Sequence, residues 1–350
     1  MAGGMGKDMA EITEVSKQKS VTLSDRQKDI IQKFAALGSL FVLIAVFSFT
    51  SSAFFTIDNG MTVALQVTSI ALLGIGATCV IITGGIDLSV GSVLALSGVV
   101  AALAVKDYGT PVWLGMMIGI LTGAICGWIN GFVVTRLRLP PFIATLGMML
   151  IARGVALQIT GARAVSGLGE SFGELGNGSF LRVVNIGEDG FPTVVFPGIP
   201  YPVILMVVIA VAVSFMLNRS VLGRHIYAVG SNPDAARLSG VNVSRIVSFT
   251  YVLSGTLAGL TGCVLMSRLV TAQPNEGVMY ELDAIASAVI GGTSLIGGVG
   301  TISGTAIGAF VIGILRNGLN MNGVSAFTQQ IIIGLVILVT VWIDQLRNRR

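Results

Sequence analysis

The chain has 350 residues, of which 53% are hydrophobic and only 11% are charged. A soluble domain has roughly 25% charged residues, so a chain of this composition could not cover its own surface in water. The composition excludes an ordinary soluble enzyme, and membrane topology explains the formal net charge of +4 better than nucleic-acid binding does.

The first 33 residues form a polar segment with alternating charges, without the apolar core and cleavage site of a signal peptide. We expect a cytoplasmic tail over 1–33 and a membrane domain over 34–345. Long stretches free of Asp, Glu, Lys and Arg follow the tail, such as Phe34–Ile57 and Asn59–Ile86. A membrane-spanning helix needs about 20 mostly apolar residues. Because these runs lack the alternation of barrel strands, they predict helices.

The charge-free runs predict an all-α, polytopic membrane protein with about ten transmembrane helices. The run Ala284–Leu315 is long enough for two helices if it breaks at its glycines, Gly291-Gly292 and Gly297–Gly300. One pair of helices fewer or more would leave both termini on the same side. Helices are expected near 34–54, 60–83, 89–105, 112–134, 141–160, 201–217, 246–267, 283–294, 301–315 and 326–343.

The basic residues orient this arrangement, because Lys and Arg are enriched in cytoplasmic segments. With both termini in the cytoplasm, the cytoplasmic segments hold fifteen of the basic residues and Arg153 lies inside a helix. Two polar connections are longer than tight turns, 161–200 outside and 218–245 inside, so each could meet a different soluble partner. The outer segments hold five basic residues, Lys106, Arg163, Arg182, Arg268 and Arg316.

The inner connection contains a short helix with its own caps. Asn232 is a good N-cap, Pro233 suits the first helical position, and Gly240 can end the helix in a left-handed conformation. A helix this short needs a surface on which to dock. Two interpretations are open, packing on its own bundle or docking on a partner. The segment consists of Asn232, Pro233, Asp234, Ala235, Ala236, Arg237, Leu238, Ser239 and Gly240.

A second segment, Gly84–Gly91, contains Asp87, the only acid between Asp58 and Asp107. An ionisable group at membrane depth indicates function by default. Alternatively, Asp87 caps the next helix with the help of Ser89. The segment also resembles 290–298 in sequence, and transporters are often built from two repeats with broken helices at their interface.

Other polar residues within the predicted spans have two interpretations each. Arg153 could line an aqueous path, or it could extend toward the membrane surface or pair with a carboxylate. Gln66 and Asn130 could line the path, although hydrogen bonding between helices is the usual role of such residues. The glycines at 115, 119, 123, 127 and 131 recur every four positions and predict close packing of the helix near 112–134.

The sequence lacks the motifs for several kinds of catalytic and nucleotide-binding chemistry. There is no P-loop and no HExxH motif, and His225 is the only histidine. Proton-coupled carriers usually hold several intramembrane carboxylates, and we expect at most Asp87 here. We therefore expect no catalytic residues, no metal site and no cofactor bound by this chain.

Three motifs together resemble the permease subunits of ribose-type monosaccharide ABC importers, in the branched-chain amino acid and ribose permease family. They are Gly84–Ser92, Gly223–Val241, and Tyr280–Ala286 with Val289–Ser294. The resemblance extends from about residue 36 to residue 344, and the N-terminal tail does not share it.

The resemblance implies a homodimer in the bacterial inner membrane whose two copies form the translocation path. It implies a cytoplasmic tandem ATPase, which binds ATP and Mg²⁺, and a periplasmic sugar-binding protein. The helix at Asn232–Gly240 would then be the coupling element. Two segments match stretches of the family that lie near the translocation path. One contains Asp87, and the other contains Thr293 and Ser294.

Two other function classes stay open at this point. An ion-coupled secondary carrier or channel would transport sugar without an ATPase, and a membrane enzyme would need a cluster of reactive groups that we cannot assemble. Within the importer interpretation the substrate is a ribose-like pentose, although another pentose, a hexose or a polyol would also fit.

Overall fold

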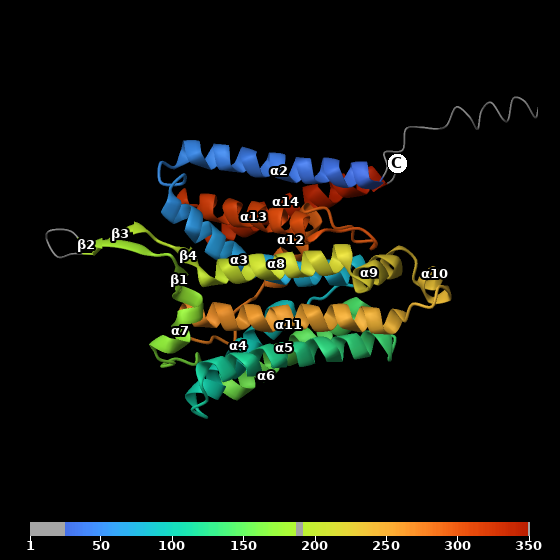
Figure 1. Cartoon of the computed structure of the whole chain (residues 1–350), viewed down its shortest axis with the longest axis horizontal. Helices are drawn as coiled ribbons and strands as arrows, with labels where there is room; N and C mark the ends of the chain where they lie inside the picture. The colour runs from blue at the N-terminus through green and yellow to red at the C-terminus, as the bar shows by residue number, and fades with distance from the viewer. Residues whose placement is uncertain (1–24, 187–191, 349–350) are drawn as a thin grey trace, which may run out of the picture.

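A computed structural model describes residues 25–186 and 192–348 of the chain. Long helices lie side by side along the longest axis of the molecule (Figure 1). The helices are α2 (Asp25–Thr50), α3 (Ile57–Ile82), α4 (Val90–Lys106), α5 (Val112–Thr135), α6 (Pro141–Thr160), α7 (Glu170–Asn177), α8 (Tyr201–Arg219), α9 (Val221–Ser231), α10 (Pro233–Leu238), α11 (Val243–Leu269), α12 (Tyr280–Ile290), α13 (Ile302–Met321) and α14 (Ala326–Asn348).

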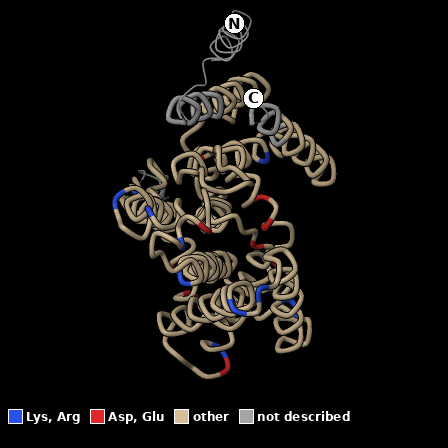
Figure 2. Tube along the Cα trace, turned by 90° about the vertical axis from the view of Figure 1, so that its right-hand side faces the viewer, with Lys and Arg blue, Asp and Glu red and all other residues tan. Residues whose placement is uncertain are grey.

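The connections lie at two opposite ends of this bundle. At one end, which we call the hairpin end, α7 lies beside β1 (Ser179–Phe180), β2 (Val183–Ile186), β3 (Pro192–Phe196) and β4 (Ile199–Pro200) (Figure 1). The strands form two antiparallel pairs, β1 with β4 and β2 with β3. At the other end, the α10 end, lie α9, α10 and the C-terminal end of α14. Figure 2 looks along the helices from the α10 end.

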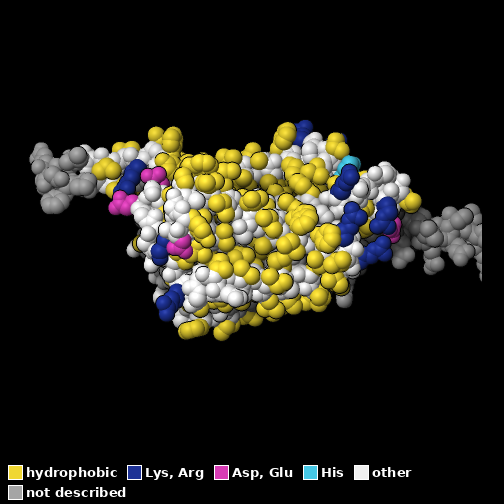
Figure 3. All heavy atoms as spheres, turned by 90° about the horizontal axis from the view of Figure 1, so that it is seen from below, with side chains coloured by type: hydrophobic (Ala, Val, Ile, Leu, Met, Phe, Trp, Pro, Cys, Tyr) yellow, Lys and Arg dark blue, Asp and Glu magenta, His cyan; other side chains and the backbone are white. Residues whose placement is uncertain are grey.

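The surface between the two ends is apolar. Large side chains such as Leu121 of α5, Ile151 of α6 and Val211 of α8 are exposed. Figure 3 shows one face of this apolar belt, with basic and acidic side chains gathered toward its two ends. With a rise of 1.5 Å per residue, a helix as long as α5 measures about 36 Å, enough for the ~30 Å hydrocarbon layer. The exposed apolar surface is therefore what a chain surrounded by lipid requires.

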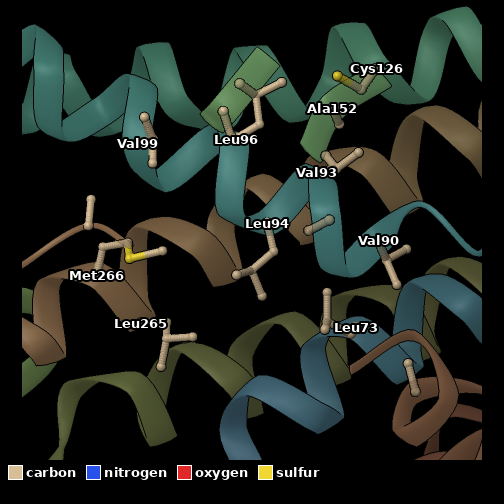
Figure 4. Packing of buried hydrophobic residues seen from close by; sticks show 14 of the residues in the cluster. Leu73, Val90, Val93, Leu94, Leu96, Val99, Cys126, Ala152, Leu265 and Met266 are labelled. Atoms are coloured by element: carbon tan, nitrogen blue, oxygen red, sulfur yellow. The ribbon is translucent and has the colours of Figure 1, made fainter. Parts of the chain in front are cut away.

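The core of the bundle is formed by α3, α4 and α11. In the most apolar 18-residue stretch of α3, 89% of the residues are buried, against 22% in α6. Figure 4 shows Leu94 of α4 packed near Leu73 of α3 and Met266 of α11. Because α3 and α11 have protein on nearly every side, they can carry polar side chains that lipid would not accept.

Close packing of α5 against α11 depends on glycine, as the four-residue spacing predicted. A Cβ on Gly123 would overlap the carbonyl oxygen of Gly255 and lie 2.8 Å from the Cα of Gly259. A Cβ on Gly127 would overlap the backbone of Tyr251. The two helix backbones therefore touch directly, and this contact fixes the position of the residues at the end of α5.

The predicted helices have counterparts in the structure, with some bounds displaced by several residues. Within the described residues, six helices are long and apolar enough to cross a membrane: α3, α5, α6, α8, α11 and α13. Shorter apolar helical stretches occupy Leu37–Thr50, Val90–Lys106 and Ala326–Val339. The helix α12 has only 11 residues and ends at the predicted break, with Gly291 as its C-cap. The segment 161–200, predicted without elements of its own, contains α7 and the four short strands.

The predicted position of Arg316 was wrong. We expected a helix ending at residue 315 with Arg316 in an outer connection, but α13 continues to Met321. Arg316 binds the buried carboxylate of Asp283 on α12, with Nη2 2.6 Å from Oδ2. Asp283 is thus a second buried acid besides Asp87. Arg268 also belongs to a helix, the last turn of α11.

Candidate functional site

The short helix α10 has the caps that its sequence predicted. Asn232 Oδ1 accepts hydrogen bonds from the backbone N–H groups of Asp234 (3.1 Å) and Ala235 (2.9 Å). Gly240 has a φ of +84°, the left-handed conformation expected beyond the end of the helix. Local sequence therefore suffices to explain why this helix begins and ends where it does.

The faces of α10 have different environments. Ala236 is buried against the bundle in the cluster that contains Ile246 of α11. Leu238 is 90% exposed. The ion pair between Arg237 and Asp234 is also exposed, with 3.3 Å between Nη1 and Oδ1. The helix is thus held to its own bundle through Ala236, while a large apolar side chain and a charge pair face outward.

Behind α10, the helix α9 contacts two Gly-rich connections at once. The hydroxyl of Tyr227 donates a hydrogen bond to the carbonyl oxygen of Gly300, at 2.7 Å. Gly230 packs so closely that a Cβ would overlap the carbonyl oxygen of Ile82 and lie 2.6 Å from the amide nitrogen of Gly298. The amide of Gly298 itself donates to the carbonyl oxygen of Ile82, at 2.9 Å.

We call this contact of Gly230, Ile82 and Gly298 the glycine junction. It brings together the connection 83–89, which follows α3, and the connection 291–301, which follows α12. These are the two segments whose sequences resemble each other. The structure therefore places the two helix breaks side by side, and both are in contact with α9.

Asp87 lies at the centre of a buried polar cluster. Its Oδ1 accepts hydrogen bonds from the backbone N–H of Ser89 (3.0 Å) and from the Ser89 hydroxyl (2.6 Å). Its Oδ2 accepts from the hydroxyl of Ser254 on α11, at 2.9 Å. Asn130 of α5 donates to Ser89 Oγ at 2.9 Å.

The cluster connects the break after α3 to two neighbouring helices, α5 and α11. Ser89 occupies the N-cap position of α4 but its side chain makes no capping bond, because the hydroxyl points to Asp87 instead. Three of the predicted path residues, Asp87, Ser89 and Asn130, thus belong to one hydrogen-bonded group. Ser254 was not predicted, since it lies 167 positions from Asp87 and only packing brings the two together.

Thr293 and Ser294 lie in the connection 291–301. Thr293 is buried, and its hydroxyl has no hydrogen-bond partner among the described residues. Ser294 is half-buried, and its backbone N–H donates to the carbonyl oxygen of Val299 at 3.0 Å. The two hydroxyls therefore belong to the connection 291–301, the second of the two breaks that meet at the glycine junction.

The remaining two predicted residues lie away from this cluster. Arg153 of α6 donates from Nη1 to the carbonyl oxygens of Pro274 (2.5 Å) and Glu276 (2.7 Å), which belong to the connection between α11 and α12. Gln66 is half-buried in the first half of α3. Both lie toward the hairpin end, so the predicted path residues fall into two groups at different depths.

Sequence reasoning missed two further polar contacts in the bundle. One is the pair of Asp283 and Arg316, whose Nη2 also lies 2.9 Å from Oδ1. The other is a hydrogen bond of 2.6 Å between the hydroxyls of Thr78 on α3 and Thr305 on α13. In the described part of the chain, no three His, Cys, Asp or Glu side chains are grouped so that they could hold a metal ion.

Comparison with known proteins gives consistent matches over most of the chain. The family model described as "Branched-chain amino acid transport system / permease component" matches residues 59–341. The ribose import permease protein of Escherichia coli (strain K12) is 44% identical, covering 88% of this chain and 92% of that protein. The ribose import permease protein of Bacillus subtilis (strain 168) is 41% identical, covering 91% and 94%.

A more distant similarity extends to a transporter named for another pentose. The xylose transport system permease protein of Escherichia coli (strain K12) is 33% identical, covering 91% of this chain and 93% of that protein. No solved structure gives a significant match.

Proposed function

Because the chain belongs to the family of branched-chain amino acid transport system permease components, we propose that it is the membrane-spanning subunit of an ATP-binding cassette importer for a monosaccharide. A ribose-like pentose is the substrate that we propose. The observation that carries this proposal is the 44% identity to a ribose import permease over most of both chains. The identity to the xylose permease is lower, 33%, which favours ribose between these two pentoses.

Reconstitution tests this proposal directly. The chain would be placed in proteoliposomes together with the ATPase and the sugar-binding protein of the same importer, and uptake of radiolabelled ribose would be measured with and without ATP. We expect uptake that needs ATP and both partners, and competition by unlabelled ribose at lower concentration than by xylose. Ribose uptake by this chain alone under an ion gradient would refute the importer and support an ion-coupled carrier.

The helix α10 is the element that we assign to coupling with the tandem ATPase, which would hold ATP and Mg²⁺. Its support is the exposed Leu238, together with the capped helix that presents it. ATP binding would draw the two ATPase halves together and move α10. The movement would pass from α10 to α9. The glycine junction would then transmit it from α9 to the two helix breaks. The bundle would then change between outward and inward openings.

Charge reversal on α10 tests this assignment. The double substitution D234R/R237E keeps the net charge and disturbs an exposed pair, which contributes only about 0–1 kcal/mol to stability. We expect normal membrane insertion, loss of ATPase co-purification and loss of ATP-driven uptake. The matched control is K106E/D107R, which reverses two adjacent exposed charges at the C-terminal end of α4 and should leave co-purification unchanged. Equal uptake by D234R/R237E and wild type would contradict the coupling role.

We propose that the sugar path is lined by residues of the two groups described above. Arg153 and Gln66 would line the part of the path toward the hairpin end. The Asp87 cluster would line the part toward the α10 end. The unpaired hydroxyl of Thr293 and the half-exposed Ser294 are suitable partners for sugar hydroxyls. Weak polarity along the path would allow release, since a tight site would hold the sugar.

The remaining parts of the assembly are proposals of the same kind. Two copies of this chain would form the path, in a bacterial inner membrane with ten crossings per copy and both termini in the cytoplasm. The positive-inside distribution of Lys and Arg supports this orientation. The hairpin end would then face the periplasm and receive the sugar-binding protein on α7 and the neighbouring strands.

A further inference from the structure

A basic groove lies between α5 and α11 at the α10 end of the bundle. Its volume is about 470 Å³, and its lining includes Trp128, Phe132 and Arg136 from the end of α5. Arg245, from the first turn of α11, lines it as well. Within residues 25–186 and 192–348, neither guanidinium forms an ion pair with a carboxylate.

An exposed apolar stripe leads along α5 to this groove. Its side chains recur at intervals of three or four residues, so they share one face of the helix. Near the groove, the rings of Trp128 and Phe132 lie side by side, with centroids 5.9 Å apart. The stripe consists of Trp113, Met117, Leu121, Ile125, Trp128 and Phe132, all of them exposed.

The combination matches the chemistry of one class of ligand. An acyl chain fits the apolar stripe, and an anionic headgroup fits two unpaired guanidinium groups where the stripe ends. The N-terminus of α11 adds the positive end of a helix dipole to the same place. We propose that this groove is a binding site for an anionic phospholipid of the leaflet at the α10 end. The proposal requires only that the chain lies in a bilayer, and it is independent of sugar and ATP.

The expected selectivity follows from the two charges. Each basic side chain near an anionic membrane surface contributes about 1 kcal/mol, so two give roughly 30-fold preference for an anionic over a zwitterionic lipid. At a tenth of the lipid, the anionic species would then occupy about three quarters of the sites. A lipid without preference would occupy about a tenth of them.

Tryptophan fluorescence can measure this occupancy at the groove itself. The double variant W113F/W342F leaves Trp128 as the only tryptophan, since the chain has three. Vesicles of phosphatidylcholine would contain a tenth of either brominated phosphatidylglycerol or brominated phosphatidylcholine. We expect about seven times more contact quenching of Trp128 by the brominated anionic lipid.

Charge variants in the same background separate a site from general attraction. R136Q/R245Q should make the two brominated lipids quench equally. R219Q/R224Q removes two exposed positive charges outside the groove and should leave the preference intact. The proposal would be overturned if both charge variants lost the preference for the anionic lipid equally. It would also be overturned if the two brominated lipids quenched Trp128 equally in the protein that keeps Arg136 and Arg245. Trp128 protected from both lipids would overturn it too, since the groove would then be covered by protein.

Discussion

The glycine junction predicts that a single methyl group on α9 will uncouple transport. In Gly230→Ala, the new Cβ would overlap the carbonyl oxygen of Ile82 and lie 2.6 Å from the amide nitrogen of Gly298. Ordinary van der Waals contact begins at 3.4 Å, so α9 and the junction must separate by at least about 0.8 Å (3.4 less 2.6). A separation of this size breaks the contact through which a movement of α9 would reach the two helix breaks.

The energetic cost can be worked from the same contacts. Overpacking costs about 1–3 kcal/mol. Losing the hydrogen bond between Gly298 and Ile82 would add about 1 kcal/mol, while alanine in place of glycine within a helix returns about 1 kcal/mol. The net destabilisation is therefore about 1–3 kcal/mol, which the bundle can tolerate by moving α9 outward rather than by unfolding.

We expect ATP-driven ribose uptake to fall at least tenfold in Gly230→Ala, with the ATPase still bound because α10 is unaltered. Uptake in proteoliposomes, ATPase co-purification and thermal unfolding in detergent would be measured together. Gly38→Ala in α2 is the matched control, since a Cβ there would meet nothing within 4 Å. Wild-type uptake by Gly230→Ala would refute the idea that α9 transmits movement through this contact.

Three further polar contacts can be tested by substitution and thermal unfolding in detergent. Asp283→Asn leaves Arg316 without its carboxylate and should cost about 3 kcal/mol, the lower end of the range because Arg316 is partly exposed, whereas D283L/R316L should recover most of this loss. Asp87→Ala removes the acceptor of three hydrogen bonds and should cost about 2–4 kcal/mol, whereas Asp87→Asn, which keeps one acceptor oxygen, should cost less. Tyr227→Phe removes the bond to Gly300 and should cost about 1 kcal/mol while lowering uptake, so unchanged uptake would argue against a role in coupling.

The parts of the fold that local sequence determines were predicted closely. The break at Gly291 and the capped helix α10 follow from residues within one or two turns of each other. The predicted helix ends were less accurate where a charged residue interrupts an apolar run. We stopped the helix at residue 315 because Arg316 interrupts an apolar run, but the chain remains helical because Asp283 neutralises that charge.

The site depends on contacts that local sequence does not contain. Asp87 was recognised because an acid in an apolar region stands out, and its neighbour Ser89 followed from proximity. Ser254 was missed because serines are common in membrane helices, so nothing in its surroundings marks it. The contact of Gly230 with Ile82 was missed for the same reason, since a glycine at the end of a short helix has many ordinary explanations.

The glycine junction explains why two similar breaks occur at the same end of one bundle. A break in α3 alone, or after α12 alone, would move independently of the other. Here the amide of Gly298 is bonded to the carbonyl of Ile82, and Gly230 presses its backbone against both. Backbone contacts have no rotatable side chains that could absorb a displacement, and packed interfaces change between discrete arrangements rather than deforming gradually. We therefore expect a movement of α9 to move both breaks together, which is the property that the proposed transporter needs to open one side of its path as it closes the other.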